Sequence, residues 1–187
     1  MIEQHPFQPF LPPGARVLFL GSFPPPANRW SIDFFYPNFI NDFWRICGLI
    51  FAGSKDAFIV PGAKRFDKNT IVDFCTCEGI ALYDTASAVN RLKGNASDKF
   101  LEIVEPTDIE ALLAQLPDCR NIVTTGQKAT DTFSERYGCT PPPIGSFTDT
   151  VIGGRPVRFW RMPSTSRAYP LPLESKAQYY RKLFEGL

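Results

Sequence analysis

Short apolar runs that alternate with helical patterns constrain the fold of this 187-residue chain more than any other feature. Val17–Leu20, Gly79–Asp84 and Asn121–Thr124 each read as a buried strand, because they are mostly apolar and too short for a helix. Apolar side chains at helical spacing mark the segments between and after them, over 38–51, 69–78, 107–117, 126–137 and 173–184. This alternation indicates an α/β protein. We expect a three-layer α/β/α sandwich with a central, largely parallel sheet of about four to five strands.

The remaining segments are less regular. Residues 98–104 fit a short strand or a helix, and residues 147–152 and 156–161, separated by two glycines, fit a hairpin or two sheet strands. No composition shift marks a domain boundary, so we expect one domain over 1–187. The Pro-rich residues 1–14 are expected to form a flexible leader.

The cysteines and the single histidine limit the chemistry. An odd number of cysteines without regular spacing favours reduced thiols in the cytoplasm. With one histidine and a Cys75-Thr76-Cys77 pair of unusual spacing, no metal and no cofactor are expected. That histidine, His5, lies in the expected leader, so a Ser-His-Asp or Cys-His mechanism is not expected either. No apolar run reaches the roughly 20 residues of a membrane span, and we expect a cytoplasmic monomer.

The charge gives no strong sign of nucleic-acid binding. The formal net charge is +1, whereas nucleic-acid-binding domains are often clearly basic. A local patch can suffice, however, and residues 155–167 contain four arginines and no acid.

Two Pro-stiffened segments each follow an apolar run. The first starts at Gly21-Ser22-Phe23-Pro24 and continues to Trp44, and the second spans Met162–Pro170. Open parallel sheets place their sites where the carboxyl ends of the strands meet. We therefore expect the two segments to line one crevice, with residue types suited to a nucleobase and its phosphates.

In this order, the motifs resemble the uracil-DNA glycosylase superfamily, with the mismatch-specific and hypoxanthine-DNA glycosylase branches nearest. The residues that carry the resemblance are Gly21-Ser22-Phe23-Pro24, Tyr36, Asn41-Asp42-Phe43-Trp44, Gly79–Asp84, Ile122–Ala129 and Met162–Ser166. The similarity spans roughly residues 16–185. Each motif alone is weak, but their order is fairly specific.

The resemblance implies a DNA glycosylase of base-excision repair that hydrolyses the N-glycosidic bond of a deaminated base, uracil or hypoxanthine. Its partner would be DNA that contains a damaged or mismatched base. A monofunctional enzyme is expected, since neither motif contains a lysine that could form a Schiff base with the sugar.

The resemblance also implies roles for individual residues. Asn41 would orient the attacking water, and Tyr36 would stack on the base. The base-binding set would be Gly21, Ser22, Phe23, Pro24, Tyr36 and Thr125, and the DNA-binding set Ser164, Thr165, Ser166 and Arg167. Each role has a structural alternative: Tyr36 as a core aromatic, Asn41 as a helix cap, and the Ser-Thr-Ser run as a turn.

Two other functions remain open on the sequence. Ser22 and Thr125 differ from residues common in relatives, which would suit a non-catalytic protein that binds nucleic acid or senses damage. The near-neutral charge would suit a hydrolase of small nucleotides or nucleosides.

Overall fold

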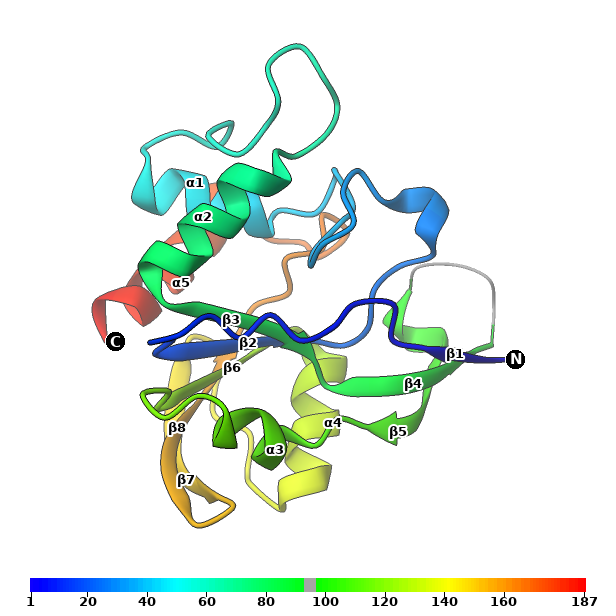
Figure 1. Cartoon of the computed structure of the whole chain (residues 1–187), viewed down its shortest axis with the longest axis vertical. Helices are drawn as coiled ribbons and strands as arrows, with labels where there is room; N and C mark the ends of the chain where they lie inside the picture. The colour runs from blue at the N-terminus through cyan, green and yellow to red at the C-terminus, as the bar shows by residue number, and fades with distance from the viewer. Residues whose placement is uncertain (93–96) are drawn as a thin grey trace.

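A five-stranded sheet forms the middle layer of the protein (Figure 1). The computed structural model describes residues 1–92 and 97–187. The strand order is β3-β2-β6-β8-β7, with β2, β3, β6 and β8 parallel and β7 antiparallel to β8. The bounds are β2 (Val17–Gly21), β3 (Ile80–Asp84), β6 (Asn121–Thr125), β7 (Ser146–Ile152) and β8 (Arg155–Met162).

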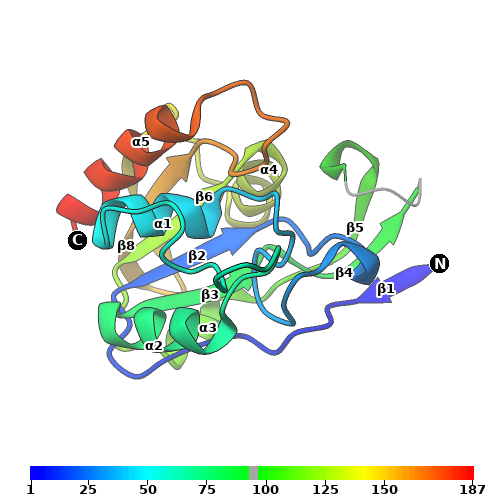
Figure 2. The same cartoon turned by 90° about the horizontal axis from the view of Figure 1, so that it is seen from above.

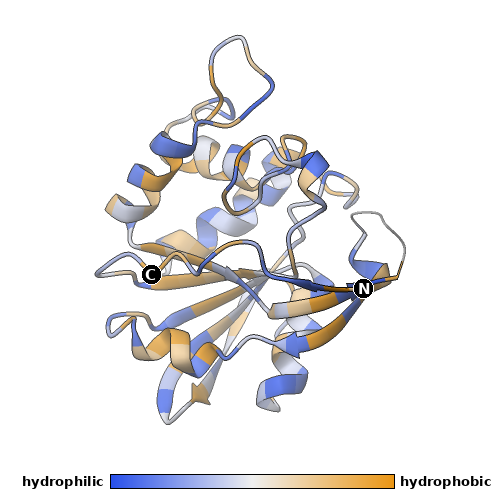
Figure 3. Cartoon of the chain, turned by 45° about the vertical axis from the view of Figure 1, so that its right-hand side comes forward, coloured by the Kyte–Doolittle hydropathy of each residue, from blue (hydrophilic) through white to orange (hydrophobic). Residues whose placement is uncertain are grey.

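Helices cover both faces of this sheet. Figures 1 and 2 show α1 (Phe43–Phe51), α2 (Lys68–Glu78) and α5 (Leu173–Glu185) on one face, and α3 (Ile109–Ala114) and α4 (Gln127–Tyr137) on the other. Every residue of β2, β3 and β6 is buried, as expected for strands covered on both sides, and apolar colour dominates the central sheet in Figure 3. The expected three-layer sandwich is confirmed.

Local hydrogen bonds set the helix ends. Asp67 and Asp108 each accept a backbone N–H three residues on, which caps the starts of α2 and α3. Helix α2 ends at Gly79, whose φ of 69° is in the left-handed region that glycine adopts readily.

Helix α1 begins at Phe43, five residues after the start expected from the sequence at residue 38. Asn38 Oδ1 accepts the N–H of Ile40, and Asn41 Oδ1 accepts the N–H of Phe43. Such side-chain bonds compete with helical ones. Residues 38–42 therefore form turns, and the helix starts at Phe43.

The expected flexible leader is instead ordered, and that expectation is wrong. Strand β1 (Ile2–Gln4) pairs with β4 (Ala86–Arg91), and Phe10 exchanges two backbone hydrogen bonds with Leu82. Strand β4 also pairs with β5 (Leu101–Pro106), which gives a second sheet of order β1-β4-β5. Short 3-10 turns occur at Ala27–Arg29 and Asp98–Phe100, so the segment 98–104 holds both a turn and a strand start.

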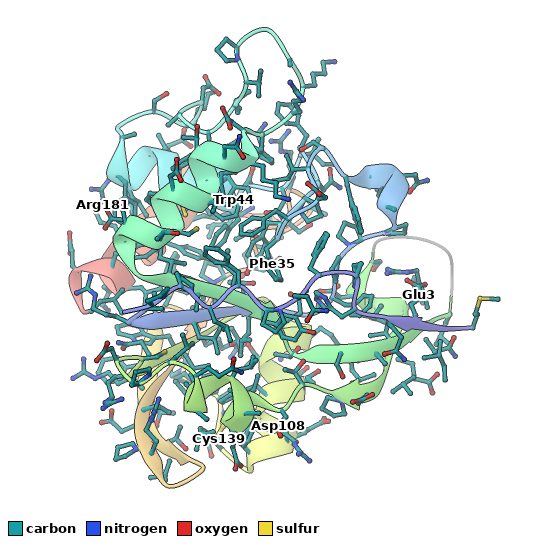
Figure 4. All side chains as sticks on the ribbon, viewed as in Figure 1. Glu3, Phe35, Trp44, Asp108, Cys139 and Arg181 are labelled. Atoms are coloured by element: carbon teal, nitrogen blue, oxygen red, sulfur yellow. The ribbon has the colours of Figure 1, made fainter. Side chains whose placement is uncertain are left out.

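Aromatic side chains fill the layer between the central sheet and helices α1 and α2. Phe35 and Trp44, labelled in Figure 4, lie there, and the indole N–H of Trp44 donates to the carbonyl of Phe35 at 3.0 Å. The loop before α1 is thereby tied to the core. Within residues 1–92 and 97–187, no helix has the length and apolar character to cross a membrane.

Candidate active site

A cavity of about 630 Å³ opens at the carboxyl ends of β2, β3, β6 and β8. The two Pro-stiffened segments that were expected to line one crevice both contribute to its wall. Every residue assigned a role from the sequence lies on its wall: Gly21, Ser22, Phe23, Pro24, Tyr36, Asn41, Thr125, Ser164, Thr165, Ser166 and Arg167. The sheet thus brings together residues that are up to 146 positions apart, from Gly21 to Arg167.

The two loops are fastened to each other through Asp42. The backbone N–H of Asp42 donates to the Thr165 carbonyl at 2.9 Å. Its carboxylate accepts from Lys176 Nζ at 2.9 Å, and Lys176 Nζ also donates to the Ser166 carbonyl at 2.8 Å. Residues 164–167 are therefore held in place by backbone and charge contacts rather than left as a free loop.

The inner wall pairs Gly21 with Asp84. These residues are register neighbours on β2 and β3, and a Cβ added at Gly21 would lie 2.5 Å from Asp84 Oδ1. Any larger residue would force the Asp84 carboxylate or the strand end to shift, whereas glycine permits the close approach. The second carboxylate oxygen, Oδ2, accepts from His5 Nε2 at 2.8 Å.

His5 is the main residue supporting the site that could not be predicted from the sequence. Its side chain is 2 % exposed and packs edge-on against Phe23, so its placement in a mobile leader is wrong. His5 does not line the cavity; it holds Asp84, which does. No local pattern could reveal this contact, because 79 positions separate the two residues.

Tyr36 serves both the core and the cavity wall. Its ring stacks on Phe43 at 3.9 Å between centroids, and its hydroxyl hydrogen-bonds with Thr125 at 2.9 Å. Burial raises the pKa of Tyr36 well above its usual range, although the Thr125 bond opposes the shift. Its φ of 50° lies in the left-handed region, which costs a bulky residue energy. Packing on Phe43 and the Thr125 bond fix this strained geometry.

We expect Tyr36→Phe to destabilise the fold by about 1 kcal/mol, because the buried Thr125 hydroxyl loses its partner while the ring stacking remains. Denaturant unfolding measures the change. Tyr179→Phe, at a half-exposed ring on α5, is the control. Equal stability of the Tyr36 variant and the wild type would contradict a structural role for this bond.

Asn41 combines a local bond with a place on the cavity wall. Its Oδ1 accepts the Phe43 N–H at 2.9 Å. Asn41 therefore does make the contact at the helix start that was its structural alternative. A carbonyl oxygen has two lone pairs, and the amide carries two N–H donors. One lone pair and the amide group thus remain for a ligand, since no described residue accepts from the Asn41 side-chain amide.

Ser22 brings a second carboxylate to the cavity. Its hydroxyl donates to Asp98 Oδ1 at 2.8 Å. Asp98 is exposed as a whole residue, but its carboxyl end is turned against the cavity wall, and burial there raises its pKa despite the Ser22 bond. This contact could not be predicted from local patterns, because 76 positions separate Ser22 from Asp98, which lies in the 3-10 turn before β5.

The arginines of the expected basic patch have separate partners. Arg155 donates to the carbonyls of Leu113 and Leu116, and Arg161 donates to Gln127 Oε1 at 2.6 Å. Arg158 lies 3.8 Å from Asp149. Of the four, Arg167 alone reaches the cavity wall. In the described part of the chain, no group of three metal-ligating side chains could hold a metal ion.

Comparison with known proteins identifies the fold. No family model and no curated protein matches the chain. Among solved structures, the chain is similar to one from Methanosarcina acetivorans described as a "putative Uracil DNA glycosylase". The identity is 23 %, 99 % of each chain is covered, and the TM-score is 0.64. The α/β/α architecture is therefore the one seen in that protein, over the full length of both chains.

Proposed function

We propose that this protein is a DNA glycosylase of the uracil-DNA glycosylase superfamily, which hydrolyses the N-glycosidic bond of a base swung out of DNA. The observation that carries the proposal is the cavity itself, because both motif-bearing loops line it. A volume of about 630 Å³ is within the usual range of small-molecule sites, roughly 300–1,000 Å³. The full-length similarity to a protein described as a glycosylase supports the same reading.

In this proposal the nucleotide enters base first. The base lies at the inner end, beside the Gly21–Pro24 loop and Tyr36. Its phosphates lie at the hydroxyl-rich 164–167 loop, where hydroxyl and guanidinium groups are suited to phosphate oxygens. Swinging a base out costs a few kcal/mol, and stacking on an aromatic ring returns about 1–3 kcal/mol.

Asn41 positions the attacking water in this mechanism. An amide cannot deprotonate water, so its effect comes from orientation and electrostatics. The bond from the sugar carbon to the base breaks with its electron pair going to the base, which leaves positive charge on the sugar and negative charge on the base. The oxygen of the positioned water then bonds to the sugar carbon, and its proton passes to the departing base or to solvent.

The enzyme is proposed to be monofunctional. Neither loop carries a lysine, but the structure adds Lys99 to the cavity wall. Lys99→Ala should keep full activity, and borohydride should trap no covalent complex with DNA. If borohydride trapped a covalent complex with the wild type but not with the Lys99 variant, the mechanism would be a Schiff base on Lys99 rather than direct hydrolysis.

A lesion panel tests the proposed function. Duplexes with a single uracil, hypoxanthine, xanthine or G·T mismatch are incubated with the protein and then treated with alkali, which cleaves abasic sites. Strand cleavage at uracil or hypoxanthine is expected. Binding without cleavage would favour a damage-sensing protein, and activity on free nucleosides alone would favour a small-molecule hydrolase.

Arg167→Ala should weaken DNA binding and lower the salt slope of log Kd by about 1, as expected for one lost phosphate contact. Arg158→Ala is the matched control, because that arginine is similarly exposed (47 % against 51 %) but lies off the cavity wall. Binding titrations over a range of salt concentrations measure both. The same slope in wild type and the Arg167 variant would remove Arg167 from the DNA interface.

A further inference from the structure

Asp42 is shared unequally between two cations. It is buried, and each carboxylate oxygen faces a different side chain. Lys176 lies 2.9 Å from Oδ2, and its side chain is 1 % exposed. Arg167 lies 3.4 Å from Oδ1, and its side chain is 51 % exposed. Lys176 is thus the closer and fully enclosed partner, whereas Arg167 makes a longer hydrogen bond of 3.4 Å with half of its side chain in solvent.

The neighbouring charges also act against a tight Asp42–Arg167 pair. Arg45 lies in the same cluster, where its guanidinium donates to the carbonyls of Phe39 and Asn41. Burial lowers the pKa of Arg45, and the positive charge of Arg167 lowers it further. Around one buried acid there are therefore three cations, and the two guanidinium groups repel each other. A second hollow adjoins the main cavity, and Asp42, Arg45 and Arg167 all line it. Its other charged groups are Lys55, Asp56 and Glu174.

Arg167 lies on the walls of both the main cavity and that adjoining hollow. Its half-exposed side chain already touches Asp42, and a modest rotation would turn it from that contact toward a ligand in the main cavity. Lys176 has no such choice, since its ammonium also donates to the Ser166 carbonyl at 2.8 Å and its side chain is fully buried.

We propose that Lys176 is a positioning residue that keeps Arg167 available to a DNA phosphate by neutralising Asp42. The DNA part of this inference rests on the proposed function. A buried carboxylate with too little compensating charge is costly, so an Asp42 that lacks Lys176 would hold its remaining cationic partner more tightly. Arg167 is that partner, and its half-exposed side chain is free to close the 3.4 Å contact. Loss of Lys176 then captures Arg167 and withdraws it from the cavity.

The test is a double-mutant cycle on binding to an abasic-site duplex, measured across salt concentrations. Arg167→Ala should weaken binding several-fold in the wild type. Lys176→Met should cost about the same, and adding Arg167→Ala to it should change nothing further. In Asp42→Asn/Lys176→Met, which removes both charges of the buried pair, binding should recover and Arg167→Ala should again weaken it. Additive losses in the first cycle would show that Lys176 is merely structural.

A measurement without DNA separates this inference from the proposed function. Phenylglyoxal modifies accessible arginines, and peptide mapping gives the rate at Arg167. We expect slower modification in Lys176→Met and faster modification in Asp42→Asn/Lys176→Met than in the wild type. Equal rates in all three would overturn the capture, whereas a wild type that binds no DNA would overturn only the proposed function.

Folding of Lys176→Met is monitored by circular dichroism. If this variant unfolds, the double variant carries the test, since it lacks the uncompensated charge. Arg167→Ala should then cost the double variant more binding than it costs the wild type, because Asp42 no longer competes for the guanidinium. An equal or smaller cost would overturn the proposal.

Discussion

Replacement of Asn41 by alanine is expected to slow base release by about tenfold or more while leaving affinity for abasic-site DNA nearly unchanged. The amide lies on the cavity wall with donors to spare, and its proposed partner is the attacking water rather than the DNA. Single-turnover cleavage of the best lesion substrate measures the rate, and titration with an abasic duplex measures the affinity.

Asn38→Ala is the matched control for this prediction. Asn38 also lies on the cavity wall, and its Oδ1 accepts the backbone N–H two residues on, as that of Asn41 does. Both variants lose the same kind of local bond, so a stability effect should be similar in the two. A rate loss of equal size in both, or none in Asn41→Ala, would remove Asn41 from the mechanism.

Gly21→Ala is expected to abolish most of the activity and to destabilise the protein by about 1–3 kcal/mol, the usual cost of overpacking. The new methyl carbon would lie 2.5 Å from Asp84 Oδ1, well inside contact distance. Either Asp84 gives up its bond to His5, or the end of β2 shifts into the cavity. Thermal unfolding and the lesion assay report the two effects.

Gly186→Ala is the control, because its added Cβ would meet no atom closer than 3.4 Å and the site is remote from the cavity wall. We expect a stability close to that of the wild type. If Gly21→Ala behaved like this control, the close packing of Asp84 against the β2 backbone would not matter for the site.

The elements that could be predicted from the sequence are those with a strong local signal. Strands β2, β3 and β6 are buried on both faces, so their residues form continuous apolar runs. The capping aspartates of α2 and α3, and the glycine that ends α2, likewise act within a few residues of the helix ends. Because parallel strands end at one edge, the convergence of the two loops follows from the same pattern.

The parts that were missed depend on contacts between distant segments. Strand β1 has three residues, and nothing in Ile2–Gln4 shows that β4 offers it an edge. The His5–Asp84 and Ser22–Asp98 bonds also join residues more than 70 positions apart. For α1 the apolar spacing was visible, but the two asparagine side chains stop the helix from starting at residue 38.

The docked N-terminal segment has a practical consequence for handling this protein. A purification tag or fluorescent carrier fused ahead of Met1 would remove the bond from the terminal amine to Asn90 Oδ1 and crowd β1, which leads directly to His5 and its bond to the carboxylate at the inner end of the cavity. The carboxyl terminus lies on the opposite side of the molecule in Figure 1. Attachment to a surface or label is better made there, where the fused part stays away from the opening through which a ligand enters.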